Sequence, residues 1–76
     1  MVFEKIRKII SEKFELSEDN ITEQTDIVED LEADSLDMAD LISSLEGEFG
    51  VEISLEDVKD FKNLGDISNY IESKIR

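Results

Sequence analysis

Apolar residues recur every three or four positions along three stretches of this chain, and that spacing is typical of amphipathic helices. The first stretch predicts a helix over about 2–15, with apolar positions Val2, Phe3, Ile6, Ile9, Ile10 and Phe14. The last stretch predicts a helix over about 64–75, in which Leu64, Ile67, Tyr70, Ile71 and Ile75 face inward. Each end of the sequence is therefore expected to contribute one helix to the core.

The middle stretch predicts a helix from about Ser35 to Phe49. Asp34 is a favourable N-cap residue, and Asp37 follows it at the spacing of a capping box. This arrangement makes Ser35 the first residue inside the helix, and Gly50 supplies a stop after the last turn. The inward stripe is expected to contain Leu36, Met38, Ala39, Leu41, Ile42, Leu45 and Phe49.

Residues 16–34 show no sustained period and predict a long first loop. Ser17 to Asn20 is expected to form a turn, and Ile27 to Leu31 one short helical turn. Scattered apolar residues are expected to pin the loop to the core: Leu16, Ile21, Ile27, Val28 and Leu31. A connection of about twenty residues is unusual in a compact domain and is often functional.

The segment before the last helix predicts one short helix over about 55–60, capped by Ser54, and Asn63 is expected to cap the last helix. The chain has no proline and no alternating strand pattern. Its 76 residues suit a single domain over 1–76. The predicted fold class is all-α: a four-helix bundle of three longer helices and one short helix, with a long first loop.

The formal net charge is −13, and its sign excludes nucleic-acid binders, which need a basic surface. The excess is concentrated between Asp26 and Asp60, where thirteen acidic residues stand against one base, Lys59. One side of the molecule is therefore expected to be strongly anionic. Composition leaves open whether that side is a solvated surface or a docking surface for basic partners.

Cysteine and histidine are both absent, which removes disulfides, thiolate–zinc sites, cysteine nucleophiles and the usual proton shuttle. A chain without cysteine fits a reducing compartment. Charged residues interrupt the apolar positions of the first helix, so the segment is not a signal peptide. No stretch is long and apolar enough to span a membrane. The expected location is the cytoplasm.

The acidic residues predict neither a metal site nor a catalytic pair. The segment that starts at Asp30 resembles an EF-hand loop only superficially, because Ser35 replaces the required glycine and Leu41 replaces the bidentate glutamate. General acid–base catalysis needs a desolvated carboxylate pair in a pocket, and a helical chain of this length provides little shelter for one. We therefore expect no catalytic residues, no metal ligands and no independent enzyme activity.

Ser35 is the remaining candidate for chemistry. No histidine or lysine lies near it in sequence to act as its base, so it is a poor nucleophile in its own right. As an acceptor modified by another enzyme it is better placed. The first turn of a helix presents unpaired N–H groups and a positive dipole end, which both favour an attached phosphate. A helix-start serine without function is the alternative, and the local physics permits either.

One extended block carries a family resemblance: Asp30-Leu-Glu-Ala-Asp-Ser-Leu-Asp37, followed by Leu41, Leu45-Glu46, Glu48-Phe49 and Val51-Glu-Ile53. It resembles the acyl carrier proteins of type II fatty-acid synthesis, and the similarity extends over essentially the whole chain. The resemblance implies a right-handed four-helix bundle. It also implies that Ser35 receives 4′-phosphopantetheine from coenzyme A through a separate magnesium-dependent transferase. The thiol of this arm would then carry growing fatty acyl groups as thioesters.

Further residue roles follow from the resemblance. Asp34 matches the aspartate beside the modified serine and is expected to support the modification. Leu36, Asp37, Asp40 and Glu46 match positions on the second helix that partner enzymes contact through basic residues. The implied partners are a phosphopantetheinyl transferase and the enzymes of fatty-acid synthesis. A monomer is expected, because the acidic surface repels itself.

Three residues depart from the family pattern. Glu32 stands where the family usually has glycine, Gly47 replaces an often acidic residue, and Ser43 replaces a usually apolar one. These changes leave open a specialised carrier with a polyketide, aminoacyl or D-alanyl cargo. An acidic helical or calcium-responsive interaction module without a prosthetic group is a further alternative.

Overall fold

The computed structural model describes residues 2–75, apart from the Leu55 side chain, and within them the chain folds into four α-helices. These are α1 (Val2–Phe14), α2 (Ser35–Phe49), α3 (Leu55–Val58) and α4 (Leu64–Ile75), with one 3-10 turn, η1 (Glu18–Asn20), in the first loop. The predicted bounds of α2 and α4 are confirmed. The α3 helix ends two residues early, and α1 ends one residue early because Glu15 adopts a left-handed conformation (φ 54°).

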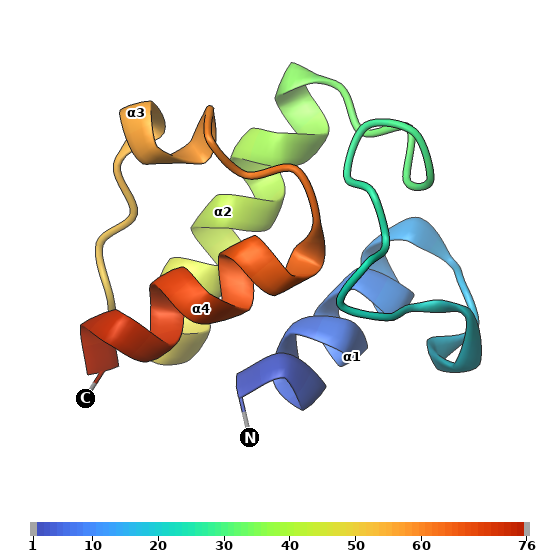
Figure 1. The fold of residues 1–76 in the computed structure, drawn as a ribbon, viewed down its shortest axis with the longest axis horizontal. Coiled ribbons are helices and arrows are strands. Elements are labelled where there is room, and N and C mark those ends of the chain that lie inside the picture. Colours follow the sequence, from blue (N-terminus) through green and yellow to red (C-terminus); the bar gives the residue numbers. More distant parts are fainter. Residues whose placement is uncertain (1, 76) are drawn as a thin grey trace.

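The core lies where α1 packs against both α2 and α4 (Figure 1). Fully buried side chains come from each of the three long helices: Ile6, Ile10, Leu41, Leu45, Leu64, Ile67 and Ile71. Burial of one such side chain contributes about 1.5–3 kcal/mol. The first and last amphipathic stripes are therefore confirmed as contributors to the core, together with α2 and the first loop.

Two ion pairs join α1 to α2. Lys13 Nζ lies 2.7 Å from Asp40 Oδ2, and Lys5 Nζ lies 3.7 Å from Glu48 Oε2. Lys5 near the start of α1 pairs with Glu48 near the end of α2, and Lys13 near the end of α1 pairs with Asp40 near the start of α2. The two helices therefore run antiparallel, with a basic face of α1 against an acidic face of α2. Lys5 and Lys13 of α1 are thus used within the fold.

Four apolar residues that were expected to face inward are exposed. Leu36 is 80% exposed, Val28 68% and Ile75 48%, and Ala39 is also exposed. For Leu36 the reason is helical geometry: it lies about two and a half turns before the buried Leu45, so the two side chains point to opposite faces of α2. Val28 lies in the first loop and Ile75 at the last residue of α4, where fewer neighbours cover them. The inward prediction for these residues is wrong.

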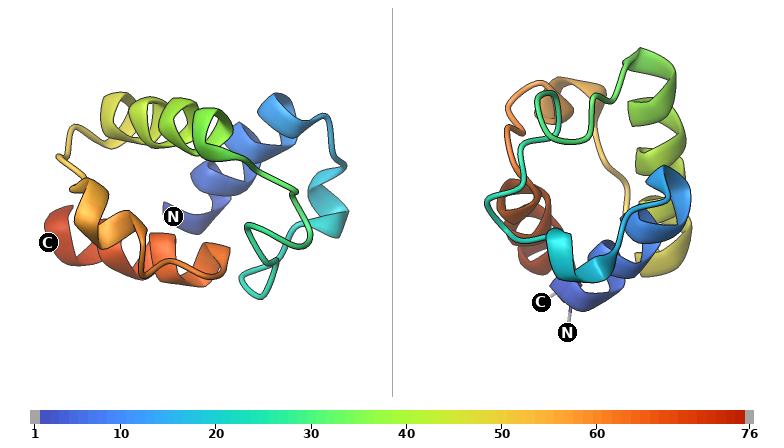
Figure 2. Two further views of the ribbon diagram at one scale, coloured as in Figure 1. Left: turned by 90° about the horizontal axis from the view of Figure 1, so that it is seen from above. Right: turned by 90° about the vertical axis from the view of Figure 1, so that its right-hand side faces the viewer.

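The long first loop is held to the connection between α3 and α4 (Figure 2). Ile27 N donates to Lys62 O (3.0 Å), and Gly65 N donates to Glu23 O (2.9 Å). Ile21, Ile27 and Leu31 are buried, so the loop is pinned to the core as predicted. A Cβ on Gly65 would lie 3.2 Å from Glu23 O, tighter than an ordinary contact, so this junction suits glycine. The loop therefore reaches α2 from an anchored position.

Candidate functional site

Asp34 and Asp37 build the start of α2. Asp34 Oδ1 accepts a hydrogen bond from Asp37 N (2.9 Å), and Asp37 Oδ2 accepts one from Asp34 N (3.3 Å). This reciprocal pair is the predicted capping box, and it satisfies two backbone donors that the helix leaves unpaired. Ser35 is therefore confirmed as the first residue of α2, and it is exposed.

The loop before α2 uses its carboxylates to hold its own backbone. Asp26 Oδ1 accepts hydrogen bonds from Val28 N (2.9 Å) and Glu29 N (2.7 Å), and Asp30 Oδ2 accepts one from Asp26 N (2.7 Å). Among the described residues, no three His, Cys, Asp or Glu side chains gather as a metal ion would require. The superficial EF-hand segment is thus an ordered turn leading to Ser35.

Glu32 occupies a strained position two residues before the N-cap. Its φ is 53°, in the left-handed region that L side chains rarely adopt. The sequence departs from the family's glycine at this residue, yet the backbone here still adopts the positive φ that glycine would favour. The strain is consistent with a loop whose path is dictated by its anchored ends.

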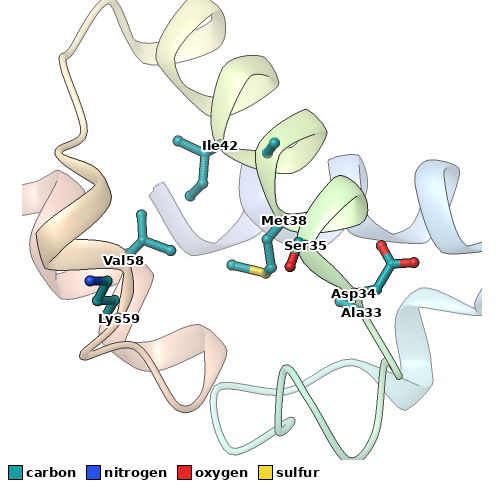
Figure 3. A pocket seen from close by; sticks show the side chains of 8 residues that line it. Ala33, Asp34, Ser35, Met38, Ile42, Val58 and Lys59 are labelled. Atoms are coloured by element: carbon teal, nitrogen blue, oxygen red, sulfur yellow. The ribbon is translucent and has the colours of Figure 1, made fainter.

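A groove of about 570 Å³ opens beside Ser35, between α2 and α3 (Figure 3). Its lining is mainly apolar and consists of Ala33, Asp34, Ser35, Met38, Ala39, Ile42, Val58 and Lys59. The α3 wall is held by α4, because Tyr70 Oη donates a hydrogen bond to Asp57 Oδ2 (2.7 Å). The site thus combines an exposed hydroxyl, a helix N-terminus and an apolar groove.

The residues expected to contact partner enzymes do not share one face of α2. Leu36, Asp37 and Asp40 are exposed, and Asp40 is the residue that pairs with Lys13. Glu46 lies about two and a half turns after Asp37, so it points to the opposite side of the helix. There Glu46 Oε2 accepts a hydrogen bond from Ile53 N (2.8 Å), which orders the connection after α2.

Sequence reasoning missed the far wall of the groove. Val58 and Lys59 belong to the segment around α3, more than twenty residues from Ser35, and no local pattern connects them. One signal was available in the sequence, namely that Lys59 is the only base between Asp26 and Asp60.

Comparisons with known proteins decide the family. The family described as "Phosphopantetheine attachment site" matches residues 4–71. The acyl carrier protein of Thermotoga maritima is 43% identical over 74 residues, covering 97% of this chain and 91% of that protein. This chain belongs to the acyl carrier proteins. The acyl carrier protein of Lactobacillus acidophilus is also 43% identical, over 72 residues, covering 95% of this chain and 90% of that protein.

A solved acyl carrier protein has the same fold. The structure from Enterococcus faecalis superposes with a TM-score of 0.83 at 41% identity, covering 96% of this chain and 92% of that one. The all-α four-helix prediction is therefore confirmed. Membership of the family also makes the chain a carrier and not an enzyme, with 4′-phosphopantetheine as its cofactor. Between residues 2 and 75, no helix combines the length and apolar character needed to cross a membrane.

The residues around the groove fit such a cofactor. Ser35 provides an exposed hydroxyl, and the unpaired N–H groups of the first turn of α2 favour a phosphate. The mainly apolar lining beside it suits a flexible arm and an apolar cargo.

Proposed function

We propose that 4′-phosphopantetheine is attached to Ser35 and that the chain carries growing fatty acyl groups as thioesters for fatty-acid synthesis. The observation that supports this proposal most directly is the position of Ser35, which is exposed at the first residue of α2 and lies at the edge of an apolar groove. The proposal includes a single carrier domain over 1–76 that works as a monomer in the cytoplasm.

Ser35 takes part in the attachment through its hydroxyl. Ser35 Oγ attacks the β-phosphorus of coenzyme A, an O–P bond forms, and the P–O bond to adenosine 3′,5′-bisphosphate breaks. The serine proton passes to the transferase, because no histidine or lysine lies near Ser35 in the sequence and the Asp34 and Asp37 carboxylates are engaged in the capping box. Asp34 supports the step by capping α2 and so holding Ser35 in a defined place. The bound arm supplies a thiol, a group that this cysteine-free chain lacks.

The groove gives the cargo a place beside the attachment point. Met38, Ile42 and Val58 present apolar side chains to it from α2 and α3. Each methylene that leaves water contributes about 0.8 kcal/mol, so a longer acyl group is expected to stabilise the loaded protein more.

The exposed part of α2 is the proposed contact for enzymes with basic surfaces. Leu36 provides an apolar anchor, 80% exposed, and Asp37 and Asp40 provide charge around it. The net charge of −13 raises the rate of encounter with a basic partner. Glu46 remains a predicted contact, with the additional structural role of accepting the bond from Ile53 N.

Mass spectrometry tests the attachment. The protein is incubated with coenzyme A, Mg²⁺ and a broad-specificity phosphopantetheinyl transferase, and its intact mass is expected to rise by one phosphopantetheine. The S35A variant should show no rise, while S43A, which alters another exposed serine of α2, should react normally. A rise that persists in S35A would refute the assignment.

A specialised carrier is the second candidate, favoured by the outer face of α2. Ser43 and Gly47, the residues that depart from the family pattern, lie at helical spacings that put them on the same face as Leu36. The altered face concerns partner choice and leaves Ser35 untouched. Offering the holo protein to fatty-acid synthases and to polyketide, aminoacyl and D-alanyl loading enzymes decides which cargo it accepts.

A further inference from the structure

Lys59 stands on the wall of the groove that begins at Ser35. It is the one base between Asp26 and Asp60, a segment with thirteen acidic residues. Its side chain is exposed, and Figure 3 shows it with Val58 on the side opposite Met38 and Ser35. The fold thus brings a lone cation to the groove from a distant part of the sequence.

This cation is not used within the described part of the chain. The ion pairs among residues 2–75 are made by Lys5, Arg7 and Lys13, all on α1. Lys59 forms none, although acids crowd its segment. Its ammonium is drawn turned away from Met38 and Ser35 in Figure 3, so rotation of the flexible, exposed side chain brings it to an anion that enters the groove.

The other charged residue of the groove does not compete for Lys59. The Asp34 carboxylate is bonded to Asp37 N (2.9 Å), and Figure 3 shows it directed away from Met38 and Val58. The groove therefore has a hydroxyl at one wall, apolar side chains between, and a cation at the other wall. Apolar surroundings strengthen a charge-assisted hydrogen bond relative to one in open water.

We propose that Lys59 binds an anionic group of the molecule held at Ser35 and thereby positions it in the groove. The inference rests on the proposed attachment at Ser35. Two groups share the required chemistry: the phosphodiester that joins the arm to Ser35, and a terminal carboxylate on the cargo. Either anion would otherwise meet the repulsion of Asp34, Asp37 and their acidic neighbours. A lysine suits both, because its ammonium acts as a point charge with three donors.

The test compares four forms of the protein: unmodified, holo, butyryl-loaded and succinyl-loaded. Butyryl and succinyl groups have equal carbon number and differ in the terminal carboxylate. The Lys59 Cε–Hε signals are followed by NMR, and thioester hydrolysis is timed in wild type, K59M and K59R. K62M is the matched control, because Lys62 is an equally charged, exposed residue that does not line the groove. Intact mass verifies each modification.

We expect the Lys59 signals to shift on modification and the K59M variant to hydrolyse about threefold faster, the effect of losing a partly exposed ion pair. The K59R variant should retain the wild-type rate. If K59M speeds hydrolysis of the butyryl and succinyl thioesters equally, the group that Lys59 binds is the phosphodiester. If it speeds hydrolysis of the succinyl thioester alone, the group is the terminal carboxylate.

Unchanged Lys59 signals in all loaded forms, with K59M hydrolysing like K62M, would overturn the role of Lys59 while leaving the attachment intact. A protein that gains no mass would overturn the attachment at Ser35 and this inference together.

Discussion

Replacing Glu32 with glycine should stabilise the protein, because the backbone at this residue is strained. Its φ of 53° is costly for a residue with a side chain, by roughly 1–2 kcal/mol. Glycine removes that cost but increases the freedom of the unfolded chain, which offsets about 0.4–1 kcal/mol. The Glu32 side chain is exposed and makes no hydrogen bond or ion pair with the rest of residues 2–75, so no contact is lost. The expected gain for E32G is about 0.5–1 kcal/mol.

The charge of Glu32 must be separated from its backbone conformation. Asp30 and Asp34 flank it in sequence, so removing one negative charge also relieves some repulsion. The E32Q variant makes that change alone, and E32A removes the side chain beyond Cβ while keeping the strained φ. The melting temperature of E32G should therefore exceed those of E32Q and E32A.

Thermal unfolding followed by circular dichroism measures this difference. For a domain of this size a gain of about 0.5–1 kcal/mol raises the melting temperature by about 2–8 °C. The E15G variant provides a second case, because Glu15 has a φ of 54° where α1 ends, remote from the groove. If E32G melts no higher than E32Q, the strain at this residue is not stored as free energy and the reasoning is wrong.

Three further predictions concern stability. The G47A variant should be about 1 kcal/mol more stable, because a Cβ at this position meets nothing within 4 Å and alanine is the better helix former. The G50A variant should be less stable, because the φ of Gly50 is 64°. Urea denaturation measures both variants, and a change of the same sign in the two would contradict the prediction. The E46A variant should be about 1 kcal/mol less stable, because it removes the acceptor of Ile53 N, whereas E46Q keeps an acceptor oxygen and should retain most of the wild-type stability. If chemical denaturation shows equal losses of stability for both variants, the effect comes from the charge alone and the prediction is wrong. Added salt should raise the melting temperature of the protein, because screening a net charge of −13 outweighs the loss of its few partly exposed ion pairs, and an unchanged value across ionic strength would count against this.

Features that depend on near neighbours could be predicted from the sequence. The start of α2 follows from Asp34 and Asp37, which bond to each other's backbone across three positions, so local chemistry sufficed to place Ser35. Gly50 ends the helix for a similarly local reason, its left-handed φ of 64°. The role of Ser35 as the attachment residue stays a prediction from the family pattern.

The tertiary structure alone decided which apolar residues are covered and what faces Ser35. Leu36 matched a helical stripe as well as Leu45 did, but only the face of α2 that carries Leu45 packs against α1 and the rest of the core, and Leu36 lies on the opposite face. The groove exists because α3 is held against α4 and so faces α2, which brings Lys59 near Ser35. Periodicity reports the shape of one helix, whereas a groove between two helices depends on packing that no local pattern encodes.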